Sequence, residues 1–103
     1  MRAMESPILI DVWTFDPSRR DEVARRISEA MRDVIVGAPG FVSAELYESA
    51  DGGAMAVIVR MGTVKERQAL TDSPEAHKVL RELRAVASSH ARLFRLAETF
   101  GEA

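Results

Sequence analysis

Two histidines are the side chains of this sequence best suited to proton transfer. His77 suits a general base, because the unperturbed pKa of histidine lies near physiological pH. On a helix it would lie at the boundary of the apolar face, about 120° from its centre, so a solvated flank position is the alternative. His90 falls where the same helix is expected to end, a place that the helix dipole favours for histidine, and we interpret it as structural.

Asp11 is a lone carboxylate in an otherwise apolar run, residues 8–15, whose β-branched and aromatic side chains predict a strand. An unpaired carboxylate is costly to bury. We therefore expect Asp11 to form an ion pair with Arg60 on a neighbouring strand. The alternative is that Asp11 faces a cavity unpaired, in which case its pKa would be raised and it would be a candidate base.

Five large apolar or aromatic side chains are candidates for contact with a hydrophobic substrate. Trp13 is either a core or dimer-interface residue or a substrate platform, and Tyr47 either donates a hydrogen bond to a substrate or covers the sheet. The other candidates fill either a core or a pocket. The set is Trp13, Tyr47, Val57, Met61 and Leu70.

Composition excludes several classes of function. The chain has no cysteine, and no metal-ligand spacing, phosphate-binding glycine loop or nucleophile motif. The 14 basic residues are interleaved with 16 acidic ones, for a net charge of -2, so nucleic acid is not an expected partner. The first seven residues lead into an apolar run too short for a secretory signal or a membrane span, and we predict a cytoplasmic protein.

Hydrophobic periodicity and turn residues predict one domain, residues 1–103, with elements in the order βαββαβ. Asp16 or Ser18 can cap the first helix, Thr63 and Glu66 form a capping box, and Ser73 with Pro74 starts the last helix. The expected elements are strand 8–15, a helix ending at the breakers 37–40, strands 41–49 and 54–61 around the turn 51–53, a short helix to about residue 71, a helix from residue 73 with apolar Val79, Leu80, Leu83, Val86 and Ala87, and strand 92–100.

This order predicts an α+β, ferredoxin-like fold, with a four-stranded antiparallel sheet and helices on one face. The first and third strands carry apolar residues on both of their faces. A large exposed apolar patch is uncommon on a soluble monomer. A second copy of the same sheet would cover it, so we expect a homodimer.

Several local motifs resemble the antibiotic biosynthesis monooxygenase family of dimeric α+β barrels, and the resemblance covers residues 8–100. It implies a cavity between helices and sheet for a hydrophobic, often aromatic, substrate. It also implies oxidation by molecular oxygen without flavin, haem or metal. The residues that carry the resemblance are Ala38-Pro39-Gly40-Phe41, Glu45-Leu46-Tyr47, Asp51-Gly52-Gly53 and Ser73-Pro74-Glu75-Ala76-His77.

The resemblance also suggests catalytic residues. Arg81 best matches an arginine on the family's second helix that stabilises an oxyanion, although the helical repeat turns it toward Lys78 and Glu82. Arg84 lies on the same line of the helix as His77 and competes for that role. Our catalytic candidates are thus His77, Arg81 and Arg84. Polyketide-oxidising members tend to carry an asparagine on the third strand and a tryptophan near its end, whereas this chain has Val57-Ile58-Val59-Arg60-Met61 there and no asparagine at all.

Together these features predict a cofactor-independent monooxygenase of secondary metabolism that acts on an aromatic polyketide or quinol-like substrate. A polyketide cyclase or isomerase using the same pocket is the alternative within enzymes. A non-catalytic dimeric ligand-binding protein is the alternative outside them.

Overall fold

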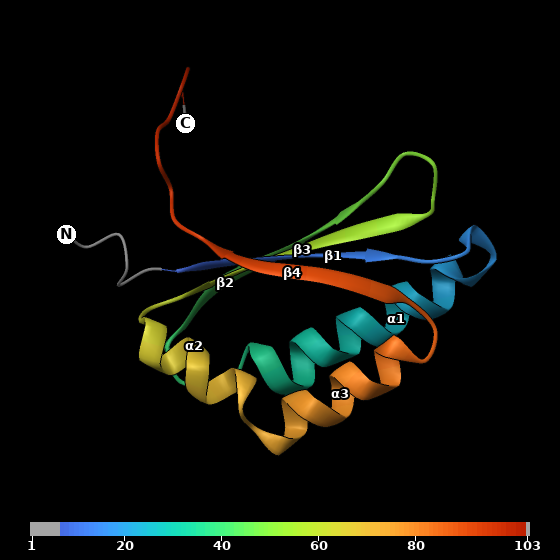
Figure 1. Ribbon diagram of the computed structural model, residues 1–103, viewed down its shortest axis with the longest axis horizontal. Helices are drawn as coiled ribbons and strands as arrows, with labels where there is room; N and C mark the ends of the chain where they lie inside the picture. The colour runs from blue at the N-terminus through green and yellow to red at the C-terminus, as the bar shows by residue number, and fades with distance from the viewer. Residues whose placement is uncertain (1–6, 103) are drawn as a thin grey trace.

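A computed structural model describes residues 7–102, which form a four-stranded antiparallel sheet with all of its helices on one side (Figure 1). The predicted βαββαβ order and the ferredoxin-like α+β fold are confirmed. A 3₁₀ turn, Pro17–Arg19, precedes the first helix and a π-helical turn, Met31–Ile35, extends it. The main elements are β1 Ile8–Thr14, α1 Arg20–Ala30, β2 Phe41–Glu48, β3 Ala54–Met61, α2 Val64–Thr71, α3 Pro74–Arg84 and β4 Ser88–Phe94. Among the described residues, no helix is both long and apolar enough to cross a membrane.

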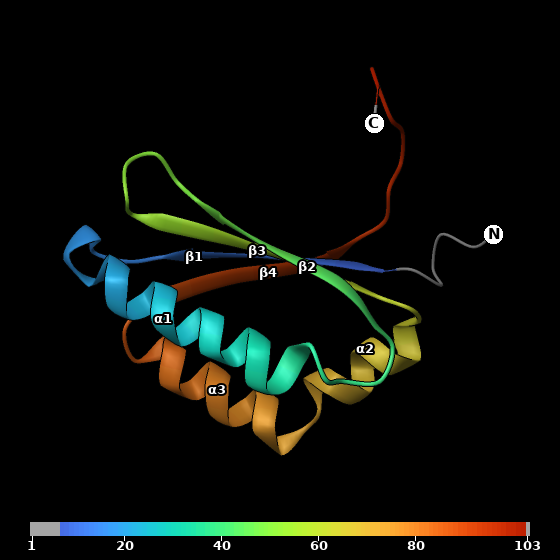
Figure 2. The same cartoon turned by 180° about the vertical axis from the view of Figure 1, so that it is seen from behind.

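The strands lie in the order β2-β3-β1-β4, so β3 and β1 occupy the centre of the sheet. Successive side chains of a strand point to opposite faces. On β3 the alternation is complete, and its buried residues form the floor on which α1 and α3 pack (Figure 2). The buried core consists of Trp13, Val23, Ile27, Met55, Val57, Val59, Met61 and Leu83.

The opposite side of the sheet, which we call the open face, carries no helix (Figures 1 and 2). Several of its side chains are apolar, and Val12 and Phe94 are 39% and 45% exposed. The strand registers assign to this face Ile8, Ile10 and Val12 of β1, Ala56, Ile58 and Arg60 of β3, Tyr47 of β2 and Arg92 and Phe94 of β4.

The helix starts agree with the capping predictions. Asp16 accepts a hydrogen bond from the backbone N–H of Ser18 at 2.9 Å and starts the 3₁₀ turn. The hydroxyl oxygen of Thr63 accepts from the N–H of Glu66 at 3.1 Å, and that of Ser73 accepts from the N–H of Ala76 at 3.1 Å. Such caps satisfy backbone donors that the first turn leaves without helical partners.

A β-bulge in β2 interrupts the alternation of that strand. Regular alternation would place Phe41 on the same side as Tyr47, but the register shifts between Phe41 and Ser43. The extra residue, Val42, is 61% exposed, and Phe41 packs against the core. One inserted residue moves the side chains that precede it in the strand to the other face of the sheet, so Phe41 and Tyr47 lie on opposite faces.

The position of the last strand was also predicted wrongly. It comprises Ser88–Phe94, not residues 92–100, and pairs along the whole of β1. The chain turns back directly after α3, because the N–H groups of Val86 and Ala87 both donate to the Leu83 carbonyl at 3.0 Å while their side chains pack against the core. His90 consequently lies within β4, opposite Val12, and its interpretation as a helix-end residue is wrong.

Candidate functional site

One flank of α3 gathers the three catalytic candidates. His77, Arg81 and Arg84 line a single open groove of about 520 Å³ with Leu80 and Ala85, and we call this hollow the α3 groove. Positions 77, 81 and 84 fall on one side of a helix because they are four and three residues apart. Arg81 was expected to point toward the side of the helix that carries Lys78 and Glu82, but Arg81 lines the α3 groove and Glu82 lines a different hollow.

The other flank of α3 faces α1. Glu82 and Val79 lie there, in a smaller hollow lined from α1 by Arg26 and Glu29. The α3 groove therefore opens on the side of the helix turned away from α1. In Figure 1, α3 lies beneath β4, the edge strand.

The part of β4 that faces the helices remains uncovered. In the strand register Ala91 lies opposite Asp11 and Leu93 lies opposite Leu9, on the side of the sheet where the core is. Ala91 is nevertheless exposed, and Leu93 is 40% exposed. The small side chain of Ala91 leaves this edge of the sheet open on the side of α3.

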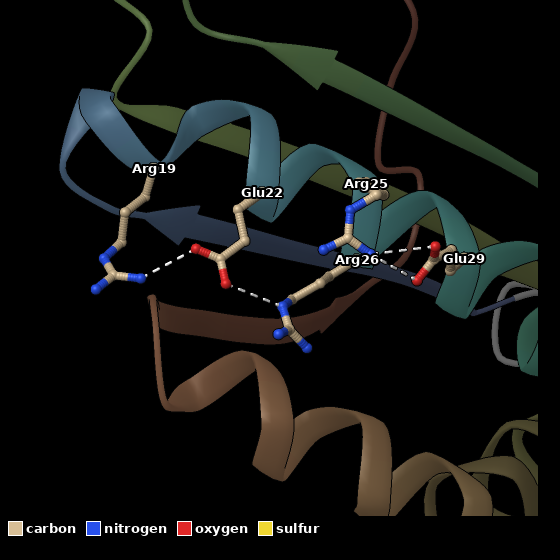
Figure 3. Close-up of polar contacts among 5 residues, drawn as sticks. All are labelled: Arg19, Glu22, Arg25, Arg26 and Glu29. Carbon is tan, nitrogen blue, oxygen red and sulfur yellow. Dashed lines mark hydrogen bonds and ion pairs between the residues drawn. The ribbon is translucent and has the colours of Figure 1, made fainter.

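The arginines of the α3 groove differ from those of α1 in their partners. On α1, Glu22 pairs with Arg19 at 3.0 Å and with Arg26 at 3.3 Å, and Arg25 pairs with Glu29 at 3.3 Å (Figure 3). Within residues 7–102 neither Arg81 nor Arg84 forms an ion pair. The α3 groove is thus a local concentration of positive charge that favours an anionic ligand.

Asp11 lies on the helix side of the sheet, opposite Val57 of β3 and Ala91 of β4. Its Oδ1 atom is buried and has no hydrogen-bond partner. The predicted ion pair with Arg60 is wrong: Arg60 pairs across the open face with Glu45, at 2.9 Å between Nη1 and Oε1. Arg60 lies opposite Ile8 in the register, and Ile8 and Asp11 are an odd number of residues apart, so the two side chains point to opposite faces.

The surroundings of Asp11 favour its protonated form. Burial raises the pKa of the Asp11 carboxyl above its ordinary value. The positive charge of Arg84 is the largest opposing influence, followed by the side chain of Trp13 and the backbone and charge of His90, but these only reduce the rise in pKa. A carboxyl with a raised pKa is a better proton acceptor than an ordinary surface aspartate.

The five predicted substrate contacts lie outside the α3 groove. Trp13, Val57 and Met61 are 3%, 4% and 1% exposed and belong to the core. Leu70 lines a different hollow, of about 380 Å³, between α2, the start of α3 and the loop after α1. Tyr47 is 53% exposed and lies on the open face.

On the helix side of the two central strands, the polar side chain is Asp11 of β1, because the side chains of β3 on that side are all apolar. The sequence contained the signal, a carboxylate in the middle of an apolar strand. Its interpretation depended on which residue of β3 lay beside it. Only the register shows that the neighbour is Val57.

Comparison of the sequence with protein families and with curated proteins gives no match. Comparison of the structure with solved structures gives many. SnoaB from Streptomyces nogalater, a cofactor-independent oxygenase, is 22% identical to this chain with a TM-score of 0.73, over 95% of this chain and 99% of SnoaB.

Two further solved structures share the fold at lower identity. A Nitrosomonas europaea protein, provisionally assigned to the antibiotic biosynthesis monooxygenases, has a TM-score of 0.78 at 11% identity and covers 94% of this chain and 95% of its own. A conserved protein of unknown function from Bacteroides thetaiotaomicron has a TM-score of 0.81 at 10% identity, over 91% of this chain and all of its own. The expected likeness to antibiotic biosynthesis monooxygenase structures is confirmed at the level of the fold.

Proposed function

We propose that this protein is a cytoplasmic, cofactor-independent monooxygenase whose substrate is an aromatic polyketide or a quinol-like compound. Its fold is that of SnoaB, a cofactor-independent oxygenase. The observation that carries the proposal is the α3 groove, which His77, Arg81 and Arg84 line without ion-pair partners among the described residues. A groove of this kind suits the anion of an electron-rich aromatic compound.

This oxidation requires few functional groups from the protein. An electron-rich phenolate or enolate can itself reduce oxygen, so the protein has to remove a proton, stabilise the anion and shield the reacting atoms from water. Arg81 and Arg84 stabilise the anion, and Leu80 and Ala85 contact the apolar rings. His77, about 10 Å along the helix from Arg84, exchanges protons with solvent at the other end of the groove.

Oxidation of an anthrone in air tests this function. The protein, freed of flavin and metal, is incubated with 1,8-dihydroxyanthrone, whose methylene carbon becomes a ketone while its two hydrogens leave with the second oxygen atom as water. We expect quinone to form faster than in buffer, and Arg81→Gln with Arg84→Gln to reduce that rate at least tenfold. A rate equal to that in buffer would contradict the proposal.

A non-catalytic ligand-binding protein is the second candidate, favoured by the third strand. The stretch 57–61, where the family resemblance leads one to expect an asparagine and, near its end, a tryptophan, contains neither, and its residues Val57, Val59 and Met61 are buried in the core. Binding of the anthraquinone product without any turnover of the anthrone would support this candidate. Turnover that proceeds equally well without oxygen would instead indicate the cyclase or isomerase.

We also infer that two copies pair through the open face. Apolar residues from three strands, among them Ile10, Ile58 and Phe94, are brought together there without any helix to cover them. An isologous pairing of two sheets would bury them in both copies at once. The helix side, with the α3 groove, would stay accessible in such a dimer.

A further inference from the structure

Asp11 is the one carboxylate among the described residues with an oxygen that is buried and has no hydrogen-bond partner. Such an oxygen costs free energy, since burial removes it from water without providing a replacement donor. Among the described residues no ion pair explains its presence in the middle of β1, and hydrogen bonding from the Trp13 side chain and the His90 backbone only partly offsets the effect of burial on the carboxyl. Asp16 and Asp51, by contrast, are exposed and accept hydrogen bonds from backbone N–H groups in their turns.

The groups that face Asp11 come from three elements. The charge of Arg84 acts on it from α3, Trp13 is its neighbour on the same face of β1, and Ala91 lies opposite it on β4. His90 lies opposite Val12, so its side chain is on the open face, and only its backbone and charge act on Asp11. From β3, Asp11 meets only Val57. Asp11 thus has mainly apolar neighbours on the sheet. The one guanidinium whose charge acts on it belongs to Arg84, which also lines the α3 groove.

We propose that Asp11 is the base that removes a proton from the substrate bound in the α3 groove, and that Arg84 holds the resulting anion. This inference rests on the proposed function and names a catalytic residue outside the three candidates on α3. The exposed Ala91, opposite Asp11 in the register, leaves the edge of the sheet open for a flat ring to reach the carboxylate.

The reaction balances with oxygen as the only other reactant. The Asp11 carboxylate takes one methylene proton of an anthrone, and the electron pair of the broken C–H bond stays on the substrate as an enolate. The enolate reduces oxygen and forms a C–O bond, and Asp11 returns its proton to the outer oxygen to give a hydroperoxide. Loss of the second methylene proton with cleavage of the O–O bond releases water and leaves the ketone, so Asp11 ends as a carboxylate.

Deuterium exchange without oxygen tests the proton transfer by itself. 1,8-Dihydroxyanthrone is incubated anaerobically in D₂O with the protein, and deuterium at the methylene carbon is followed by NMR. We expect the native protein to accelerate exchange over buffer and Asp11→Asn to lose at least 100-fold of that acceleration, the scale of general base catalysis. Asp11→Glu should keep more of it than Asp11→Asn, and Asp21→Asn, an exposed aspartate on α1, should keep all of it.

Folding of each variant is checked by circular dichroism, and binding of 1,8-dihydroxyanthraquinone shows that the groove is intact. If Asp11→Asn does not fold, Asp11→Leu, an apolar replacement of similar size, takes its place. Exchange within threefold of the native rate in a folded variant overturns the proposal, as does native protein that fails to accelerate exchange. If the native protein exchanges deuterium and Asp11→Asn does not, but no quinone forms in air, Asp11 is the base and the oxygenase function is overturned. If the native protein and Asp11→Asn form quinone equally fast, the oxygenase function is supported and the role of Asp11 as base is overturned.

Discussion

Asp11 and Arg84 interact through charge but differ in their exposure to solvent. Arg84 is exposed on α3, whereas the Oδ1 atom of Asp11 is buried on the sheet without a partner. The attraction of the guanidinium offsets only part of the effect of burial, so the pKa of Asp11 stays above its ordinary value. A residue retained for structure would improve stability, whereas a carboxylate retained for proton transfer can reduce it.

Replacement of Asp11 by Asn is therefore expected to stabilise the protein at neutral pH. Because the pKa is higher in the folded state than the 3.8 of an unperturbed aspartate, the folded state binds the proton more tightly. Stability of the native protein relative to Asp11→Asn should fall as the pH rises through and beyond 3.8, and level off above the folded pKa. Urea unfolding of both proteins between pH 3 and 8 measures the difference.

Below pH 3.8 the Asp11 carboxyl is protonated in both states, so its titration should no longer contribute to the difference between the two proteins. A control variant, Asp21→Asn, should show no such trend, since Asp21 is solvent-exposed. Asp11→Asn that is less stable than the native protein at pH 7 would assign Asp11 a structural role.

Arg84 lowers the pKa of Asp11, so its removal should raise that pKa further. In Arg84→Gln the acid limb of the pH profile, where Asp11 loses the ability to accept a proton, is expected to move to higher pH. Arg81→Gln should reduce the rate of oxidation without moving the limb, because Arg81 is not among the charges that act on Asp11. The rate of anthrone oxidation, measured from pH 4 to 8 for each variant, distinguishes the roles of the two arginines. An acid limb at the same pH in both variants would contradict this assignment.

At the scale of elements, the start of α3 fixes the placement of the groove. The hydroxyl of Ser73 accepts from the N–H of Ala76 and donates to the Leu70 carbonyl at 2.8 Å, joining α2 to α3. Ser73→Ala should cost about 1 kcal/mol of stability. Ser28→Ala, inside α1, should cost nothing, because alanine is the better helix former. Chemical unfolding compares the two, and equal stabilities would show that the cap is unimportant.

Turn residues and periodicity were sufficient to predict the elements of this fold and their order, because caps, breakers and alternation are local. Three local conclusions failed where the outcome depends on a distant strand. The bulge at Val42 reversed the face of Phe41, pairing with β1 fixed β4 at Ser88–Phe94, and the register gave Asp11 an apolar neighbour. The helical repeat, in contrast, brought His77 and Arg84 together correctly, since their relation lies within one helix.

At the scale of the whole molecule, both faces of the sheet carry apolar side chains, but helices cover only one of them (Figures 1 and 2). If a second copy covers the open face, Ile10→Lys should prevent pairing, because it places a charge beside Arg92 at the centre of that face. Light scattering should give the mass of two chains for the native protein and of one for the variant. Val36→Lys, an exposed position outside the open face, serves as the control. A native protein with the mass of one chain would contradict the dimer.

The segment after β4 also carries large exposed apolar side chains. Beyond Phe94 the chain leaves the sheet on the side away from the helices (Figure 2), and Leu96 and Phe100 are 68% and 81% exposed. Side chains of this size contribute about 1.5 to 3 kcal/mol each when buried, so in a dimer they would add to the interface. Leu96→Ser with Phe100→Ser should weaken dimerisation at least tenfold, measured by analytical ultracentrifugation, and leave the circular dichroism spectrum unchanged. An unchanged dissociation constant would show that this segment lies outside the interface, even if the open face forms it.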